Sequence, residues 1–189
     1  SPVLAPAGVA FSASGTLYVA NQNTSTVLKF NSNGFATTFG GGISNPFGMT
    51  FDDGGNLYVA NKSGYSITKI NPAGVSTSLV SGMPAYPYDV AFRDGYVYAT
   101  VQDRGQVLRF DAAGVGTVFS TAVAEPRGLA FDAAGNLFVT DRQSQSIKEI
   151  STSGVVTTFA SSPGEPLDLA FDSNGYLYLS TYNNFIMKY

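Results

Sequence analysis

One stretch of the sequence, PRGLAFDAAGNLFVTD from Pro126 to Asp141, occurs with variations five times along the chain. Each copy consists of two short apolar runs separated by a polar turn, and a phenylalanine closes the first run. This phenylalanine recurs about every 40 residues, a period typical of architectures in which each unit buries its faces against its neighbours. Its positions are Phe11, Phe51, Phe92, Phe131 and Phe171. We therefore predict a single domain, residues 1–189, built from five repeats.

The residues between successive phenylalanines predict four antiparallel strands in each repeat. In the fourth repeat the first run ends at Phe131, and a turn with Asp and Gly leads into a second run, 136–140, rich in β-branched and aromatic residues. A polar loop leads to a third run at 147–150, and a second turn with Gly leads to a fourth at 155–160. No segment shows the period of an amphipathic helix over about ten residues or more.

The distribution of polar residues within the repeat favours a β-propeller. The first two strands of each unit are apolar at almost every position, as expected for strands covered on both faces. The fourth strand alternates with Thr and Ser, as an outer strand does. Four-stranded units with buried inner strands are typical of radial propeller blades. We therefore predict an all-β propeller of five four-stranded antiparallel blades, with a β-solenoid as the alternative architecture.

The last repeat is predicted to lack its fourth strand. The repeats span 6–45, 46–86, 87–125, 126–165 and 166–189. The fifth ends at Tyr189 after three predicted strands, so the outer strand of the last blade is missing. Residues 1–5 can supply it from within the chain, which would close the ring. Otherwise the last blade keeps an open edge that can accept a strand from a neighbouring chain.

Composition argues against several classes of function. The formal net charge is -3 and only 12% of the residues are charged, so no basic surface for nucleic acid is expected. The chain has no histidine and no cysteine, which excludes Ser-His-Asp and Cys-His catalysis and any histidine-based zinc site. No apolar run is long enough to span a membrane. The abundance of Ser, Thr, Asn and Gly leads us to expect an extracellular or periplasmic protein.

The repeat also resembles a known family. Its pattern, P-x-G-[LV]-A-F-D-x-x-G-N-L-Y-V-[AT]-[ND] followed by I-x-K-I and G-x-x-T-T-F, is similar to the NHL repeat and to the SMP-30/gluconolactonase-like and streptogramin-lyase-like propellers. The resemblance covers nearly the whole chain and implies the propeller fold, whereas such propellers include binding platforms, ligand sensors and enzymes. The lyase-like relatives depend on histidine, so their mechanism cannot be carried over to this chain.

The resemblance leaves one enzymatic alternative, a divalent-metal-dependent lactonase or hydrolase. The SMP-30-like lactonases hold their ion with Glu, Asn and Asp at the channel mouth. Asp89, Asp168, Asn61 and Asp141 are the candidates for that role in this sequence. No glutamate matches the ligand position of these enzymes, which weakens this alternative.

Acidic residues are predicted to gather on one face of the ring. In a propeller blade, the loop before the first strand and the loop after the second strand share a face, because adjacent strands are antiparallel. The acids of the first-hairpin turns are explained by side-chain-to-backbone hydrogen bonds. Six of the 13 acidic residues fall in the loops of the shared face, namely Asp89, Asp103, Glu125, Asp141, Glu165 and Asp168. We expect function to reside on this loop face.

Asp89 and Asp168 are the most informative of these acids. They replace the glycine that the other repeats carry at the same position, Gly8, Gly48 and Gly128, at the predicted border of the channel mouth. One interpretation is a carboxylate pair for a polar ligand or for a cation such as Ca²⁺, which prefers oxygen ligands. The other is that each carboxylate caps a nearby backbone N–H.

Further candidates for ligand binding lie in the same loops. Three of them follow the second strand of their repeats and either line the mouth or form turns. The others supply arginine and tyrosine, which are frequent anchors of binding sites. The predicted ligand-binding residues are Asp89, Asp168, Asn21, Asn61, Asp141, Arg127, Arg142, Tyr88 and Tyr182.

These observations favour a non-catalytic extracellular module that recognises a protein, a polar small molecule or a glycan through its loop face. No cofactor is predicted, apart from Ca²⁺ as a candidate at the channel mouth, and neither a nucleic-acid partner nor a membrane span is expected. A structural alternative is a subunit that forms a homo-oligomer by donating a strand to the incomplete last blade. The metal-dependent lactonase is the second alternative.

Overall fold

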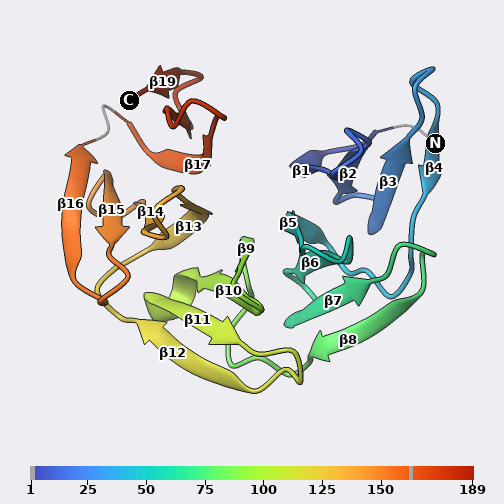
Figure 1. Ribbon diagram of the computed structural model, residues 1–189, viewed down its shortest axis with the longest axis horizontal. Helices are drawn as coiled ribbons and strands as arrows, with labels where there is room; N and C mark the ends of the chain where they lie inside the picture. The colour runs from blue at the N-terminus through green and yellow to red at the C-terminus, as the bar shows by residue number, and fades with distance from the viewer. Residues whose placement is uncertain (1–2, 162–163) are drawn as a thin grey trace.

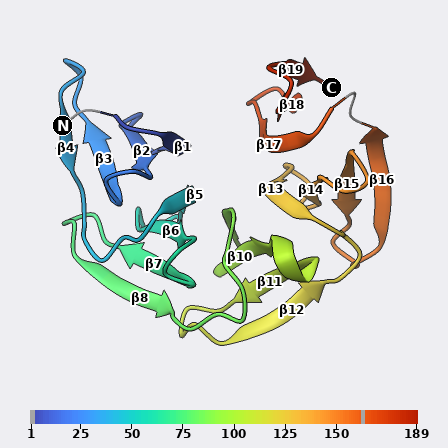
Figure 2. The same cartoon turned by 180° about the vertical axis from the view of Figure 1, so that it is seen from behind.

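The computed structural model describes residues 3–161 and 164–189, and it contains five antiparallel β-sheets (Figures 1 and 2). The sheets follow one another around a common axis, with the first strand of each sheet near the centre (Figure 1). The predicted all-β propeller with five blades is therefore confirmed. Each blade continues into the next through the outer strand at its periphery, so the chain returns to the axis at the start of every repeat.

The strands follow the predicted repeats. The first blade contains β1 (Pro6–Phe11), β2 (Leu17–Asn21), β3 (Thr26–Phe30) and β4 (Ala36–Thr38). The second contains β5 (Pro46–Phe51), β6 (Leu57–Asn61), β7 (Ser66–Ile70) and β8 (Ser76–Val80). The third contains β9 (Val90–Arg93), β10 (Tyr96–Val101), β11 (Gln106–Phe110) and β12 (Gly116–Ser120), with a short 3-10 helix, η1 (Gln102–Arg104), after β10.

The last two blades differ in their number of strands. The fourth contains β13 (Pro126–Phe131), β14 (Leu137–Asp141), β15 (Ser146–Ile150) and β16 (Val156–Ser161). The fifth contains β17 (Pro166–Phe171), β18 (Leu177–Thr181) and β19 (Ile186–Lys188). Inner strands of successive blades pack in chain order, β1 against β5, β5 against β9, β9 against β13 and β13 against β17.

The first hairpin turns use acidic residues as the sequence predicts. In the fourth blade the carboxylate of Asp132 accepts the backbone N–H of Asn136 at 2.8 Å and its side-chain amide at 2.9 Å. Asp52 holds Asn56 in the same way in the second blade. Gly135 closes the turn with a φ of 96°, a conformation that L-residues rarely adopt. These acids therefore stabilise turns.

A repeated aromatic position on the second strand joins each blade to the next. Phe138 in β14 lies between Phe159 of its own blade and Phe171 of the following blade, with ring centroids 5.0 Å apart in both pairs. Edge-to-face pairs of this kind contribute about 0.5–1.5 kcal/mol beyond the burial of apolar surface. The same position holds the buried rings of Tyr18, Tyr58 and Tyr98. This repeated position therefore serves packing within and between blades.

The ring is open between the first and the last blade (Figures 1 and 2). Ile186 in β19 is 78% exposed, whereas Ile147 at the same position of the fourth blade is fully buried. Val9 in β1 is 61% exposed, whereas Leu129 at the matching position is 4% exposed. Within the described residues, the two end faces are therefore blade interfaces that no further blade covers.

Leu4 and Ala5 of the N-terminal segment pack on the first blade and do not extend the last one. The fifth sheet has three strands among the described residues. Leu4 donates its backbone N–H to Asn21 Oδ1 at 2.7 Å, and a backbone hydrogen bond ties Ala5 to the loop after β2. Because these contacts hold Leu4 and Ala5 against the first blade, the predicted pairing of residues 1–5 with β19 is not formed by this part of the segment. Residues 1–2 lie outside the described residues.

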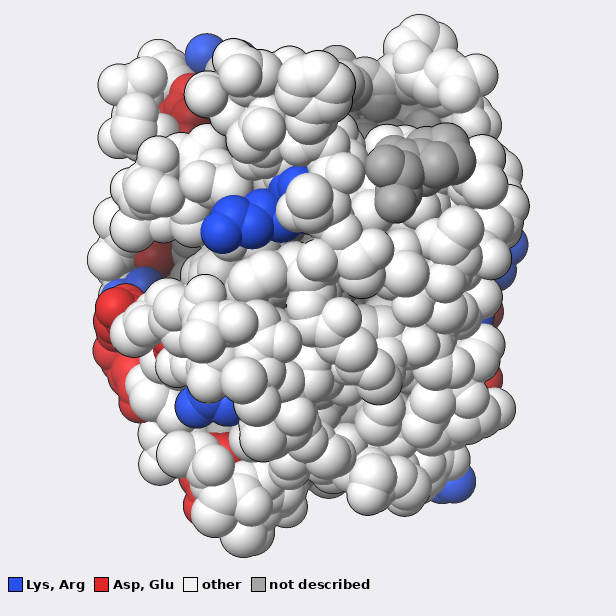
Figure 3. Space-filling view, turned by 90° about the vertical axis from the view of Figure 1, so that its right-hand side faces the viewer, with Lys and Arg blue, Asp and Glu red and all other residues white. Residues whose placement is uncertain are grey.

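The outer surface carries few charges. On the side of the molecule seen in Figure 3, over the first two blades, basic and acidic side chains are scattered among uncharged ones. Across the described parts of the chain, no helix is long and apolar enough to cross a membrane. This side of the molecule therefore presents no concentrated charge.

Candidate functional site

A β-bulge follows the proline at the start of the first strand. In the fourth blade Pro126 and Leu129 pair with β14, and the register shifts between them, at Arg127 and Gly128. Similar shifts follow the first proline of β1, β5 and β17. Bulges re-aim side chains and are frequent beside functional sites. The residues released from the ladder in this way line the cavity on the propeller axis.

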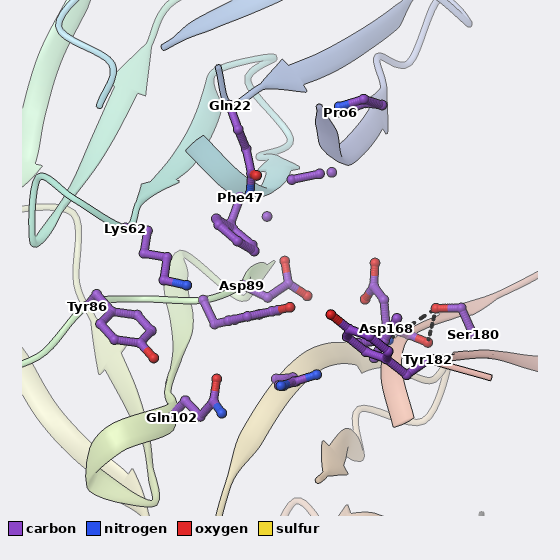
Figure 4. A pocket seen from close by; sticks show the side chains of 16 residues that line it. Pro6, Gln22, Phe47, Lys62, Tyr86, Asp89, Gln102, Asp168, Ser180 and Tyr182 are labelled. Atoms are coloured by element: carbon purple, nitrogen blue, oxygen red, sulfur yellow. Dashed lines mark hydrogen bonds between the residues drawn. The ribbon is translucent and has the colours of Figure 1, made fainter. Parts of the chain in front are cut away.

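All five blades contribute to one cavity of about 550 Å³ on the loop face (Figure 4). This volume falls in the range of small-molecule sites in proteins. The residue after each proline lines it: Ala7, Phe47, Tyr88, Arg127 and Leu167. The residue after the second strand lines it in four blades: Gln22, Lys62, Gln102 and Tyr182. We call this space the central cavity.

Asp89 and Asp168 lie at the base of the central cavity. Both also line a second cavity of about 350 Å³, whose other walls include apolar side chains of the first strands such as Val9, Met49 and Leu129. Figure 4 shows the two carboxyl groups on either side of the space between the third and fifth blades. They therefore mark the boundary between a polar mouth and a more apolar channel.

Glycines make room for these two carboxyl groups. A Cβ atom on Gly48 would lie 1.7 Å from Asp89 Oδ1, and one on Gly128 would lie 2.5 Å from Asp168 Oδ1. Each aspartate thus lies over the glycine of the preceding blade. This packing explains why each aspartate is preceded by a glycine in the repeat before it, because a side chain there would clash with the aspartate.

Both carboxylates also cap backbone N–H groups, as one of the two interpretations predicts. Asp89 Oδ1 accepts the N–H of Val90 at 2.8 Å, and its Oδ2 accepts the N–H of Leu129 at 3.1 Å. Asp168 Oδ1 accepts the N–H of Leu169 at 2.8 Å. These bonds join the third blade to the fourth and fix the carboxylates at the base of the cavity. Capping does not remove them from the cavity wall.

The two carboxyl groups resist ionisation. Burial raises the pKa of Asp89 well above its ordinary value of 3.8, and the nearby charge of Asp168 raises it further, against the effect of the two amide bonds. Asp168 has surface open to the cavity, but the surrounding protein removes most of its hydration and raises its pKa as well. Two interacting carboxyls titrate as a pair. Hence the pair carries less negative charge than two ordinary aspartates over the pH range between their ordinary and raised pKa values.

Arg127 places an unpaired cation in the wall of the central cavity. The side chain is 9% exposed, and its Nε and Nη1 donate no hydrogen bond to any described residue. Its Cζ lies 5.5 Å from the centre of the Tyr88 ring. A buried donor without an acceptor costs about 1–3 kcal/mol, and more when it is charged. Arg127 thus lines the cavity as a cation, and two of its donors are buried without an acceptor among the described residues.

A second cation, Lys62, stands among aromatic rings at the mouth. Its Nζ lies 4.8 Å from the ring centres of both Phe47 and Tyr86. The rings of Phe47 and Tyr88 are 4.7 Å apart. Figure 4 shows Lys62 and Phe47 pointing into the cavity from the second blade. One wall of the cavity is thus aromatic and carries positive charge.

Arg142 lies at the rim and outside the cavity lining. Its Nε bonds Glu165 Oε2 at 2.8 Å, and its Nη1 bonds Glu125 Oε2 at 3.0 Å. The two glutamates precede the prolines of the fourth and fifth blades. The predicted binding residue Arg142 therefore joins two loops, and its charge is neutralised within the protein.

Asn21, Asn61 and Asp141 lie beneath the loops. Each accepts a backbone N–H from the loop that precedes the proline of its own blade, at distances of 2.7–3.3 Å. All three are buried, and none lines the central cavity. Their geometry corresponds to the turn-forming interpretation. By holding these loops, they set the position of the bulge residues that follow.

The central cavity unites five of the nine predicted site residues, Asp89, Asp168, Tyr88, Arg127 and Tyr182. Sequence reasoning missed Gln22, Gln102 and Ser180 among the lining residues. The two glutamines follow the second strand of their repeats, the position held by Lys62 and Tyr182. Alignment of the repeats was therefore a signal that could have identified them. The hydroxyl of Ser180 accepts the backbone N–H of Asp168 at 3.2 Å.

The phenols of the cavity are proton donors at neutral pH. Burial raises the pKa of Tyr86 to about 12, and its hydrogen bond to Asp103 adds to this effect. Burial also raises the pKa of Tyr88, against the opposing influence of Arg127. Neither hydroxyl is suited to remove a proton near pH 7. The cavity is better equipped to donate hydrogen bonds than to perform base catalysis.

The donors of the cavity do not suit the Ca²⁺ ion suggested by the sequence. Among the described residues, no three or more acidic side chains gather as ligands for a metal. Asp89 and Asp168 bond backbone amides and share their cavity with the cations Lys62 and Arg127. Calcium sites instead gather six to eight oxygen ligands with several negative charges. The same argument applies to the divalent ion of a lactonase.

Solved structures with the same fold include enzymes and a protein of a binary complex. A virginiamycin B lyase from Staphylococcus aureus has 19% identity and a TM-score of 0.81 over 100% of this chain and 71% of its own. A gluconolactonase from Xanthomonas campestris has 16% identity and a TM-score of 0.83, over 97% and 71% of the two chains. A chain of a nidogen/laminin complex has 17% identity and a TM-score of 0.89, over 99% and 76%. At these identities the likeness establishes the fold.

The comparisons confirm the predicted resemblance to gluconolactonase-like and lyase-like propellers at the level of the fold. No curated protein matches the sequence. One family model matches residues 8–130, which is more than half of the 189 residues. The chain belongs to the family of that model, which is described as a repeat of unknown function (DUF6923).

Proposed function

We propose that this propeller is a non-catalytic recognition module whose ligand binds in the central cavity of the loop face. The observation that carries the proposal is the contrast between constant packing positions and varied cavity positions. The residue after the proline differs in every blade, being Ala7, Phe47, Tyr88, Arg127 or Leu167. A rigid framework that presents different side chains to one cavity is typical of binding sites.

The ligand of this module is a polar small molecule, a glycan or a segment of a protein. The cavity offers phenol, amide, carboxyl and cationic groups, which can orient a polar ligand. A propeller of the same fold occurs in the nidogen/laminin complex, which supports a protein as one class of partner. The proposal includes an extracellular or periplasmic location, for which the low charge and the abundance of Ser, Thr, Asn and Gly are the support.

A lactonase or hydrolase function receives less support. The expected ion lacks a suitable set of ligands, and the raised pKa values of Tyr86 and Tyr88 leave these groups protonated near pH 7. The chain also lacks histidine, the usual general base. A screen for lactone hydrolysis with added Ca²⁺, Mg²⁺, Mn²⁺ or Zn²⁺ would reveal this activity. Turnover that disappears in Asp89→Asn would establish the enzymatic alternative.

A ligand screen with a double variant tests the recognition proposal. We expect the parent protein to bind at least one class among glycans, peptides and small polar molecules, detected as a rise in its melting temperature. In Asp89→Asn/Asp168→Asn the affinity for that ligand should change by about tenfold, since hydrogen bonds to charged groups contribute about 1.5–3 kcal/mol. Asp111→Asn, in a turn of the opposite face, is the matched control. If no class binds, or if both variants bind as the parent does, the site is assigned wrongly.

A second candidate function, self-assembly into a homo-oligomer, is favoured by the two uncovered end faces. Ile186 and Val9 lie on surfaces of the kind that pack together at every internal blade boundary, and β19 also has a free edge. Association through these ends should appear as a mass that rises with concentration in sedimentation experiments. Ile186→Asp should abolish the rise, with Val155→Asp, an exposed site on the fourth blade, as control. A mass that stays monomeric at every concentration would exclude this candidate.

A further inference from the structure

The central cavity gathers two cations beside two carboxyl groups whose pKa values are raised, in a chain of net negative charge. The chain carries a formal net charge of -3. The cavity contains two cations, Lys62 and Arg127, and two carboxyl groups, Asp89 and Asp168, that resist ionisation. Whenever one of the carboxyls keeps its proton, the lining has a net positive charge. In that state an anion that enters is attracted by the lining even though the protein as a whole repels it.

The guanidinium of Arg127 is the place in the cavity where an anionic group would bind. Nε and Nη1 of Arg127 have no acceptor among the described residues, although the side chain is 9% exposed. The neighbouring carboxylate at the rim, Glu165, is bonded by Arg142 instead. Arginine binds planar oxoanions through two parallel N–H···O bonds. A carboxylate in the cavity would place a negative charge beside this guanidinium, which forms no ion pair with any described residue.

The walls around Arg127 select for an organic body on that anion. Tyr88 lies against the guanidinium, and Phe47 packs on Tyr88 with ring centroids 4.7 Å apart. Lys62 lies over the same rings and provides a second positive charge. A flat apolar or aromatic group can stack on this wall, as aromatic pairs do in protein interiors. The volume of about 550 Å³ accommodates such a group together with its carboxylate.

We propose that the central cavity binds a small aromatic or apolar carboxylate, with its anionic group on Arg127 and Lys62 and its ring against Phe47 and Tyr88. The proposal rests on the recognition function proposed above and specifies the chemical class of its ligand. A single negative charge suits the site better than the double charge of inorganic phosphate, since Asp89 and Asp168 border the same space. The phenol of Tyr88, whose pKa is raised by burial, supplies a further donor for the oxygen atoms of the ligand.

Pairs of probes that differ in charge test this inference without any variant. Benzoate, phenylacetate and hydrocinnamate are titrated into the full chain beside their neutral amides, with inorganic phosphate as a further probe, and binding is followed by changes in amide NMR signals. We expect each carboxylate to shift signals of cavity residues and to bind about tenfold or more tightly than its amide. Phosphate should bind more weakly than the carboxylates.

Substitutions of Arg127 then test whether its charge causes the preference for carboxylates over amides. Arg127→Gln should weaken carboxylate binding about tenfold to a hundredfold and leave the amides unaffected, whereas Arg127→Lys should retain part of the preference. Lys148→Gln, which removes a cation on β15 outside the cavity lining, should bind as the parent does. Melting curves of each variant show whether it is folded, and the carboxylate-to-amide ratio of the parent protein decides the inference even where a variant is not.

The outcomes separate this inference from the recognition function. If carboxylates and amides bind equally, or if a folded Arg127→Gln keeps the preference for carboxylates, the anion assignment is wrong while recognition through the cavity stands. If neither these probes nor any ligand of the wider screen binds, both fail. If phosphate binds most tightly and competes with benzoate, the site is a phosphate site and the organic body plays no part, which also overturns the proposal.

Discussion

Two arginines of the fourth blade stand on the same loop face and have opposite surroundings. Arg142 bonds Glu165 at 2.8 Å and Glu125 at 3.0 Å. Arg127 is 9% exposed, and its Nε and Nη1 donate to no group of the described chain. The protein itself neutralises the first charge, whereas it holds the second in a cavity wall without an acceptor. The comparison separates a charge that fixes loops from a charge that is available to a ligand.

The repeat position of each arginine accounts for the difference. Arg142 follows the second strand, where its side chain reaches the glutamates that precede two successive prolines. Its hydrogen bond lowers the pKa of Glu165 and keeps that carboxylate ionised. Arg127 follows a proline and occupies the bulge, so its side chain enters the lining of the cavity. Fifteen residues of separation along one blade thus place the same side chain in two different environments.

We expect the largest change in stability from a substitution that fills the space occupied by Asp89 at the base of the cavity. In Gly48→Ala the new Cβ would meet Asp89 Oδ1 at 1.7 Å and its Cα at 2.6 Å. We expect a loss of about 3 kcal/mol in the free energy of unfolding, because overpacked sites cost about 1–3 kcal/mol. Gly41→Ala, whose Cβ would meet nothing within 4 Å, is the control. Equal stability of the two variants in urea unfolding would show that the second and third blades do not pack so closely.

Removing the two arginine charges should change stability in opposite directions. Arg127→Met takes away buried donors that lack acceptors, so the free energy of unfolding should rise by about 1–3 kcal/mol. Arg142→Met removes two ion pairs and should lower it. Urea unfolding of both variants and of the parent protein measures whether the free energy of unfolding rises or falls in each. A loss of stability in Arg127→Met would mean that the guanidinium has an acceptor or a packing role that the described structure does not show.

Salt should affect the two arginines to different degrees. The ion pairs of Arg142 are about one third exposed, so added salt screens them. The stability difference between Arg142→Met and the parent protein should therefore shrink from low to high ionic strength. The difference for Arg127→Met should change less, because it arises from buried donors. Identical salt dependence of the two differences, measured by thermal unfolding, would contradict this distinction.

The smallest effect concerns the pH dependence of the acids beneath Arg127. A carboxyl whose pKa is higher in the folded protein stabilises the fold fully below its unfolded pKa, and this contribution is lost as pH rises through the folded pKa. Burial gives Asp89 such a raised pKa. Asp89→Asn should therefore gain melting temperature relative to the parent protein as pH rises from about 4 to neutrality. A difference that stays constant with pH would show that Asp89 titrates normally.

Much of the fold could be predicted because its determinants are local and repeated. The phenylalanine period, the Asp-Gly turns and the aromatic position of Tyr18 each describe contacts within a repeat or between identical faces. The path of residues 1–5 was not predictable in this way. It depends on whether the hydrogen bonds of Leu4 and Ala5 to the first blade prevail over pairing with β19, a competition that occurs once in the chain and leaves no periodic signal.

The site was predictable in part. Asp89 and Asp168 were visible as departures from a glycine that the other repeats share. Asn61 has the same polar character as a binding residue, but its partners are backbone groups of a loop 17 residues away. The sequence also places Arg127 and Arg142 on one face without distinguishing them. Only the distances between loops of different blades determine which of these side chains lacks a partner.

The residue after each proline lines the cavity, and in four of the five blades it lies at a β-bulge. Residues on either side of it build the blade interfaces and are constrained by their neighbours, whereas this residue contacts the cavity. Each blade thus contributes one residue at this position, and the five residues are Ala, Phe, Tyr, Arg and Leu. A substitution at one of these five positions changes one side chain of the cavity lining and leaves the other four and the packing of the blades unchanged. If the proposed recognition function holds, the ligand preference of this propeller can be changed one repeat at a time.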